Sequence, residues 1–342
     1  MNPKSKRIDA LISLGVHLGD FKNNHSNYSN LQDSIEKAIV NNAWFNQENI
    51  ESTFRSWSKA LNENQVKKWV SKYNFKDVKK PKTVALILAG NIPMVGFHDI
   101  VSVWVSGNNA DIKCASKDKF LIPYMTDFLE KETGISAFKF TDQHFTDFDA
   151  VIATGSNNSA RYFNHYFGKY PNIIRKNRNG IAILNGQETK SQMEGLATDI
   201  IQYYGLGCRN VSKVYIPNDY DINFIFGGLY RYSKVIENAK YANNYDYNKA
   251  VFLMSDYTFL ENGFFIIRED KGFSAPIACL HYEYYSNEIE LEEHLNENRE
   301  SIQCIISNMP IKRKIDFGSS QQPSLWDYAD ELDTLSFLNN LH

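Results

Sequence analysis

Residues 84–115, VALILAGNIPMVGFHDIVSVWVSGNNADIKCA, decide the fold class of this chain. The stretch opens with VALILA, an apolar run of strand length, and closes with a second such run, ADIKCA. The residues between them have helical periodicity and end at Gly107, and glycine is common directly after a helix. Two strands joined by a helix in this way form a parallel βαβ unit with a right-handed crossover.

The same alternation continues toward the C-terminus. We expect a helix over residues 119–131, strands near residues 138–140 and 150–154, a helix after GSNNS, and a strand at residues 181–184. This order predicts an α/β fold with a doubly wound, Rossmann-type nucleotide-binding domain. Further strand-like runs at residues 212–217, 264–267, 274–282 and 301–307 predict a second α/β domain.

The length of 342 residues corresponds to about two domains at roughly 150 residues each. Before residue 77 the apolar spacing predicts helices over residues 8–18, 31–40 and 50–70. The expected parts are a helical segment (1–76), a nucleotide-binding domain (77–204), a catalytic thiol domain (205–320) and a tail that packs back on the body (321–342).

Charge and cysteine content exclude several classes of protein. Lys and Arg number 37 against 40 Asp and Glu, so the net charge of −3 predicts no nucleic-acid partner. No stretch approaches 18 uninterrupted apolar residues, which predicts no transmembrane segment. The four cysteines are far apart and form no C-x-x-C pair, so we expect no metal site, no disulfide framework and a cytoplasmic location. Whether the chain forms a homo-oligomer stays open.

Three segments follow expected strands and could contact a ligand. Asn91 and Pro93, in GNIP, come after the first strand, where an Asn amide can stabilise an oxyanion. Lys113 ends the next strand and could reach a ribose or a 2′-phosphate. Gly155 and Ser156 open a helix whose free N–H groups could hold a pyrophosphate. Each segment by itself also fits an ordinary turn, N-cap or solvated lysine.

Residues 150–187 contain no Asp or Glu but several Lys and Arg. Such a stretch suits a polyphosphate ligand such as a dinucleotide or coenzyme A, and it equally suits a solvated basic face.

Cys208 differs from the other three cysteines. Cys114, Cys279 and Cys304 lie in apolar, strand-like runs typical of buried core residues. Cys208 instead lies in GLGCR, where glycines permit close approach of a substrate and the following Arg209 favours a thiolate. We therefore identify Cys208 as the candidate nucleophile.

The ordered set of GNIP, Lys113, TGS and GLGC resembles the aldehyde dehydrogenase superfamily, and more narrowly its acyl-CoA reductase branch, typified by the fatty-acid reductase of bacterial bioluminescence. The resemblance implies that Cys208 is the nucleophile and that Asn91 contributes to the oxyanion hole. It also implies that Lys113 binds the cofactor's adenosine ribose and that Gly155 and Ser156 lie beside the pyrophosphate.

Two departures from that superfamily matter. Residues 273–276, FSAP, are similar to its E-x-F-G-P segment, which places Phe273 at the cofactor, but Lys271 stands where the ribose-binding Glu is expected. The general base that hydrolytic members carry some thirty residues before the nucleophile would fall in PNIIRKNRNG, residues 171–180, which has no carboxylate.

Lack of a base that activates water favours reduction of an acyl thioester over oxidation of an aldehyde. The expected activity is therefore that of an NADPH-dependent acyl-CoA reductase that forms a fatty aldehyde through an acyl-cysteine, with NADPH expected rather than NADH. The donor is acyl-CoA or an acyl carrier. The alternatives are another oxidoreductase of the superfamily and a non-catalytic nucleotide- or CoA-binding protein.

Overall fold

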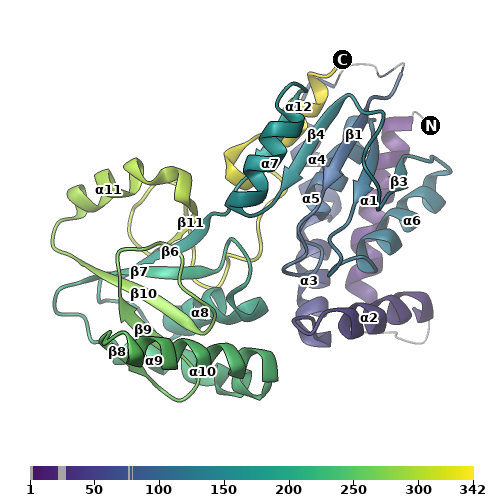
Figure 1. Cartoon of the computed structure of the whole chain (residues 1–342). Coiled ribbons are helices and arrows are strands. Elements are labelled where there is room, and N and C mark those ends of the chain that lie inside the picture. The colour runs from purple at the N-terminus through teal and green to yellow at the C-terminus, as the bar shows by residue number, and fades with distance from the viewer. Residues whose placement is uncertain (1–2, 22–27, 76–77, 79) are drawn as a thin grey trace. The chain divides into compact units, whose positions relative to one another are not determined.

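The computed structural model describes residues 3–21, 28–75, 78 and 80–342 (Figure 1). The chain divides into two compact units. Unit 1 comprises Met1–Lys176 with Pro323–His342, and unit 2 comprises Asn177–Gln322. Among the described residues, no helix has the length and apolar character needed to cross a membrane.

Unit 1 is built on five parallel strands in the order β3-β2-β1-β4-β5. Their bounds are β1 Thr83–Ile87, β2 Asn109–Lys113, β3 Phe138–Phe140, β4 Ala150–Thr154 and β5 Asn172–Arg175. The central strand β1 is apolar and buried along its middle, as a strand covered on both faces must be. The order 3-2-1 followed by a reversal to β4 confirms the predicted Rossmann-type sheet.

The helices of unit 1 are α1 Pro3–Asp20, α2 Ser29–Asn41, α3 Gln47–Ala60, α4 Glu63–Val70, α5 Phe97–Ser106, α6 Leu121–Thr133, α7 Asn157–Phe167 and α12 Thr334–Asn339. The single helix expected over residues 50–70 is in fact two. Asn62 ends the run because its side chain accepts the N–H of Gln65 and so caps a new helix, α4.

The C-terminal tail belongs to unit 1. Buried Arg175, at the end of β5, donates to Asp99 of α5 at 2.7 Å and to Thr334 of α12 at 2.8 Å. The indole N–H of Trp69 donates to the hydroxyl of Tyr328 at 2.7 Å. These buried bonds attach the last twenty residues to the first sheet.

Unit 2 contains seven strands in the order β12-β11-β6-β7-β10-β9-β8, parallel except for β8. Its strands are β6 Asn179–Ile183, β7 Val211–Pro217, β8 Phe259–Glu261, β9 Ile266–Glu269, β10 Cys279–Tyr285, β11 Ile302–Ile306 and β12 Lys314–Ile315. Its α-helices are α8 Lys190–Ile201, α9 Asn223–Leu229, α10 Ala239–Met254 and α11 Glu288–Glu297.

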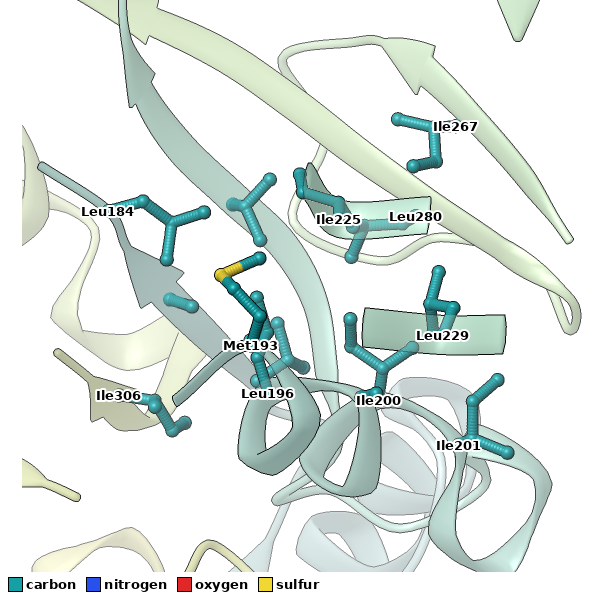
Figure 2. Packing of buried hydrophobic residues seen from close by; sticks show 14 of the residues in the cluster. Leu184, Met193, Leu196, Ile200, Ile201, Ile225, Leu229, Ile267, Leu280 and Ile306 are labelled. Carbon is teal, nitrogen blue, oxygen red and sulfur yellow. The ribbon is translucent and has the colours of Figure 1, made fainter. Parts of the chain in front are cut away.

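Both faces of this second sheet are covered. On one face Met193, Leu196 and Ile200 of α8 pack against strand residues such as Leu280, and Leu229 of α9 extends the cluster (Figure 2). On the other face Leu291 and Leu295 of α11 pack against Ile181, Ile183 and Tyr215. Unit 2 is therefore an α/β layer structure with its own core.

The boundary between the units falls after Lys176 and not near residue 204. Strand β6 pairs with β7 and β11 of the second sheet, and α8 packs on that sheet. Residues 177–204 thus belong with unit 2, although they were expected in the nucleotide-binding domain. Local periodicity identifies an element but not the sheet to which a strand will pair.

Candidate active site

The structure brings four of the predicted site residues to one edge of the first sheet. Asn91 follows β1, Lys113 is the last residue of β2, and Gly155 and Ser156 follow β4. Strands β2, β1 and β4 are direct neighbours, and Ile87 of β1 is in register with Lys113. The carboxyl ends of parallel strands form the ligand-binding edge of such sheets, and this is where these side chains lie.

The segment after β1 is a loop rather than the first turn of a helix. Helix α5 begins at Phe97, so the helix expected between the two apolar runs covers only the second half of that stretch, and residues 92–96 are not helical. Pro93 and Met94 are buried, whereas Asn91 is exposed. Met94 has a φ of 56°, a left-handed value that rarely suits a residue with a side chain. Asn91 therefore lies on a loop whose neighbouring residues 93 and 94 are buried and, at Met94, strained.

Asp118 supports this loop and was not identified from the sequence. Its carboxylate accepts the Met94 N–H at 2.8 Å. Burial raises the pKa of Asp118 to about 7, against the opposing effect of that hydrogen bond. In the sequence it lies within SKDK, residues 116–119, which has the composition of a solvated loop. Nothing in its local context distinguishes Asp118 from a surface aspartate.

Lys113 is partly exposed, and its ammonium lies 3.5 Å from the carbonyl oxygen of Gln143. Ser156 caps α7 by accepting the N–H of Ser159 at 3.2 Å, and no acidic residue lies in the first turn of that helix. A Cβ added at Gly155 would lie 2.8 Å from the Ser159 Cβ and 2.9 Å from the Phe163 ring. The close approach of Gly155 to α7 therefore requires glycine.

The acid-free stretch 150–187 does not present all its cations together. Arg175 is 5% exposed and is held by Asp99 and Thr334 inside unit 1. Arg178 belongs to unit 2, where it donates to the Arg299 carbonyl at 3.4 Å. Arg175 therefore fits neither of the two interpretations of this stretch, a polyphosphate site or a solvated basic face, because it is buried and paired inside unit 1.

Cys208 lies in unit 2 at a tight turn between α8 and β7. The Asn210 N–H donates to the Gly207 carbonyl at 3.0 Å, which makes Cys208 the second residue of a turn. The thiol residue is partly exposed. A few residues earlier, Tyr203, Tyr204 and Gly205 have φ values of 55°, 59° and 73°. A run of left-handed residues is costly and recurs at functional sites.

Asn210 holds this turn in place, and sequence reasoning missed it. It is 3% exposed; its side-chain oxygen accepts the Gly207 N–H at 2.8 Å. Its amide donates to three carbonyls at the end of α8, those of Asp199, Ile200 and Gln202. One buried amide thus joins the end of α8 to the cysteine turn.

The side chain of Arg209 also has a structural role. Its Nε donates to the Ser320 carbonyl at 2.6 Å, and both carboxylate oxygens of Asp199 accept N–H groups of the same segment, from Gly318 and Ser320. The side chain next to the thiol therefore anchors residues 318–320, a use that its sequence position does not show.

The other three cysteines are poor nucleophiles. Burial raises the pKa of Cys114, Cys279 and Cys304 to about 12 in each case. Thiols with such pKa values stay protonated at neutral pH, so these three are unsuited to nucleophilic attack.

The predicted cofactor residue Phe273 is in unit 2, and its ring packs against the core on the α11 face. It stacks on His294 at 6.1 Å between ring centroids, and the Phe273 carbonyl accepts the Ser212 hydroxyl at 2.6 Å. Buried Lys213 lies 5.5 Å from the ring centroid. The ring thus serves packing, and contact of this residue with a cofactor stays a prediction. Lys271 is exposed.

Among the described residues, no group of three or more His, Cys, Asp and Glu side chains is arranged to hold a metal ion.

No protein-family model matches the sequence, and no curated protein matches it. Solved structures do match the fold. An aldehyde dehydrogenase from Physcomitrella patens, in complex with succinate, has a TM-score of 0.63 at 13% identity, over 90% of this chain and 73% of that one. A glyceraldehyde-3-phosphate dehydrogenase from Methanocaldococcus jannaschii, complexed with NADP, has a TM-score of 0.62 at 12% identity, over 91% and 77%.

An indole-3-acetaldehyde dehydrogenase complexed with NAD+ matches with a TM-score of 0.63 at 12% identity, over 95% of this chain and 75% of that one. Identities this low establish the fold alone. The chain has the aldehyde dehydrogenase fold, which confirms the predicted fold class of a Rossmann-type sheet, a second α/β sheet and helices at the N-terminus.

Proposed function

We propose that this protein is an NADPH-dependent acyl-thioester reductase that converts an acyl-CoA or a carrier-bound acyl group into an aldehyde. The observation that carries the proposal is Cys208, a partly exposed thiol on a turn held by Asn210, within an aldehyde dehydrogenase fold. Burial raises the pKa of the other three thiols, which makes them poorer nucleophiles and supports Cys208 for covalent catalysis.

In this proposal the Cys208 thiolate attacks the thioester carbonyl. The new C–S bond forms at the enzyme sulfur as the C–S bond to CoA, or to another carrier thiol, breaks. That thiol leaves with the bonding electron pair. No general acid is needed, because a thiolate is a good leaving group. The product of this step is an acyl group held on Cys208 as an enzyme thioester.

Asn91 is proposed to donate its side-chain amide to the oxyanion of the tetrahedral intermediate. Removal of a single such donor typically lowers the rate on the order of 100-fold or more. The exposed position of Asn91 at the carboxyl end of β1 supports this role, because ligands of this sheet class bind at that edge.

The acyl-cysteine must be kept from water if it is to be reduced. Residues 171–180, which include β5, carry no carboxylate that could activate a water molecule. Glu188 is the next acidic residue, and its carboxylate accepts the backbone N–H groups of Asn185 and Gly186. This local use of the carboxylate supports reduction over hydrolytic release.

The cofactor would be held at the carboxyl edge of the first sheet. The acid-free first turn of α7, capped by Ser156 and preceded by Gly155, fits a pyrophosphate. Lys113 fits an adenosine ribose or its 2′-phosphate. NADPH is proposed from the resemblance of the sequence to the acyl-CoA reductases. A bound nicotinamide cofactor would supply hydride to the acyl carbon of the enzyme thioester. The C–S bond to Cys208 would then break, which releases the aldehyde and returns the electron pair of that bond to the Cys208 sulfur. Lys271 offers no carboxylate for the nicotinamide ribose, so that contact must differ from the superfamily's.

Two measurements test the proposal. Without cofactor, a panel of acyl-CoAs of graded length should add one acyl mass to the intact protein, mapped to Cys208 and absent in Cys208→Ala. With cofactor, the same acyl-CoAs should drive NADPH consumption in the wild type only. Cys304→Ala is the matched control, because it removes a buried thiol, and it should keep both activities.

Oxidation of an aldehyde is the second candidate, favoured by the aldehyde dehydrogenases that share the fold. Faster turnover of an aldehyde with NAD+ than of acyl-CoA with NADPH would support it. If no acyl-CoA modifies Cys208 while nucleotides still raise the melting temperature, the chain is instead a non-catalytic nucleotide- or CoA-binding protein.

A further inference from the structure

The loop that carries Asn91 packs closely on the loop that follows β2. A Cβ added at Gly90 would lie 2.6 Å from the Ala115 Cβ and 3.3 Å from both the Cβ and the backbone nitrogen of Asp118. Real Cβ atoms do not approach other atoms at the shorter of these distances. The residue directly before Asn91 is therefore pressed against residues 115–118, and the two loops behave as one packed unit.

Met94 joins the two loops through its backbone. Its φ of 56° lies in the left-handed region, and its side chain is 1% exposed. A left-handed residue with a side chain persists only where surrounding structure holds it. The hydrogen bond from the Met94 N–H to the Asp118 carboxylate, at 2.8 Å, supplies that restraint.

Asp118 has no evident structural task besides this one. It is 3% exposed, and its second carboxylate oxygen, Oδ1, has no hydrogen-bond partner among the described residues. It does not cap the next helix, since the N-cap of α6 is Phe120 and no side chain caps that helix. Burial of a carboxylate with a single partner lowers stability, so Asp118 is better explained by its bond to Met94 than by a contribution to the free energy of folding.

We propose that Asp118 is a positioning residue of the active site, which fixes the backbone at Met94 and thereby sets where the Asn91 amide projects. The inference rests on the proposed function, because it assigns Asp118 to the oxyanion role of Asn91. Asp118 acts through the loop and touches no reacting atom.

A double-mutant cycle tests this coupling. The readout is the rate at which an acyl-CoA modifies Cys208 without cofactor, measured by intact mass. Asn91→Ala should slow the reaction on the order of 100-fold or more. Asp118→Ala should slow it at least about tenfold, and the double variant should be no slower than Asn91→Ala. Asp118→Asn keeps an acceptor oxygen for the Met94 N–H, so it should retain most of the rate.

The matched control is Asp149→Ala. Asp149 accepts the N–H of Thr83 at 2.9 Å, so it holds the opposite, amino-terminal end of β1 by the same kind of bond. Its loss should lower the melting temperature without changing the rate of acylation. In steady state, Asp118→Ala should lower kcat and leave the KM for NADPH unchanged. A general destabilisation of the sheet would instead change both constants.

If Asp118→Ala does not fold, a second pair of variants tests whether the packing of the two loops controls the rate of acylation. Gly90→Ala should displace the loop and slow acylation, and Ala115→Gly added to it should restore most of the rate, because it removes the nearest clashing atom. A Gly90→Ala variant that acylates at the wild-type rate overturns the inference.

The two possible failures are distinguishable. Wild-type protein that forms no adduct at Cys208 refutes the proposed function, and the inference falls with it. The other outcome overturns only the positioning role of Asp118. In that outcome the wild type is acylated normally and Asn91→Ala slows the reaction, but Asp118→Ala slows the double variant by a further, additive amount.

Discussion

At the residue scale, buried polar side chains hold the two loops that carry the candidate chemistry. Asn210 holds the cysteine turn and Asp118 holds the Asn91 loop, each through backbone N–H groups or carbonyls. Each of these hydrogen bonds offsets part of the cost of burying the polar side chain that makes it. Both residues lie next to a candidate catalytic residue in the fold, which makes them sensitive points for mutation.

Gly180 offers a test of the cysteine turn. A Cβ at this position of β6 would lie 2.6 Å from the backbone oxygens of both Arg209 and Asn210. Gly180→Ala should therefore shift the turn after Cys208, cost about 1–3 kcal/mol in the free energy of unfolding, and slow acylation of Cys208.

Chemical denaturation and the adduct rate measure these two effects. Gly227→Ala in α9 is the control, because no atom lies within 4 Å of its added Cβ. It should leave acylation unchanged and stabilise the protein by about 0.5–1 kcal/mol. Wild-type acylation in Gly180→Ala would contradict the prediction.

Asp118 gives the protein a specific pH dependence. Its pKa is raised to about 7 in the folded state, against roughly 4 when unfolded. Between those two pH values the folded protein binds more protons than the unfolded protein, so its stability falls as the pH rises. Asp118 contributes at most about 1.4 kcal/mol per pH unit to this fall. The full loss of stability from Asp118 is reached above pH 7, and none of it is present below pH 4.

Asp118→Asn removes the titration. Unfolding free energies of the wild type and the variant, compared at pH 5 and pH 8, should show the variant gaining relative stability at the higher pH. Identical pH dependence in the two proteins would mean that Asp118 is not the responsible group.

At the element scale, a buried ion pair joins β5 to α5, and a hydrogen bond from the same arginine reaches α12. Arg175 and Asp99 are each 6% exposed in their side chains, with 2.7 Å between nitrogen and oxygen, and Thr334 shares the guanidinium. Strand β5 itself was not predicted, because NIIR offers only two consecutive apolar residues. Its place in the sheet comes from pairing with β4 and from this contact.

Removal of one partner should therefore be costly. Arg175→Ala leaves the Asp99 carboxylate buried without its cation, and about 3–5 kcal/mol of stability should be lost. Arg175→Met combined with Asp99→Leu should recover much of that loss, because no charge is left buried. Urea denaturation of the three variants measures both steps, and equal stability of the single and double variants would argue against the ion pair.

At the scale of the whole molecule, the chain leaves unit 1 after Lys176 and returns to it at Pro323. The tail supplies Tyr328 to Trp69 and Thr334 to Arg175, so unit 1 is completed only by the last residues of the chain. Unit 2 has a separate core that uses no residue of the tail.

Truncation after Gln322 should consequently destabilise the two units unequally. Unit 1 should become sensitive to limited proteolysis, because the loss of the tail exposes buried surface and breaks the bonds to Trp69 and Arg175. Unit 2 should remain protected as a fragment beginning near residue 177. The fragments are identified by mass spectrometry, and equal cleavage of both units would refute the prediction.

The sequence by itself determined the alternation of strands and helices around β1, β2 and β4, the parallel α/β class, and the candidate residues at the ends of these three strands. These features follow from local signals, because apolar periodicity, glycines and caps act between residues that are close in the chain. The same reasoning singled out Cys208, and its proposed role stays a prediction that the acylation experiment tests.

Only the tertiary structure decided that β6 joins the second sheet, that Arg175 is buried, and that Asp118 and Asn210 support the two loops. Each of these depends on partners distant in the chain, such as Asp99 for Arg175, or on burial that the residue's neighbours in sequence do not reveal. A buried aspartate and a solvated one have the same sequence context, and only the packed fold removes the water that distinguishes them.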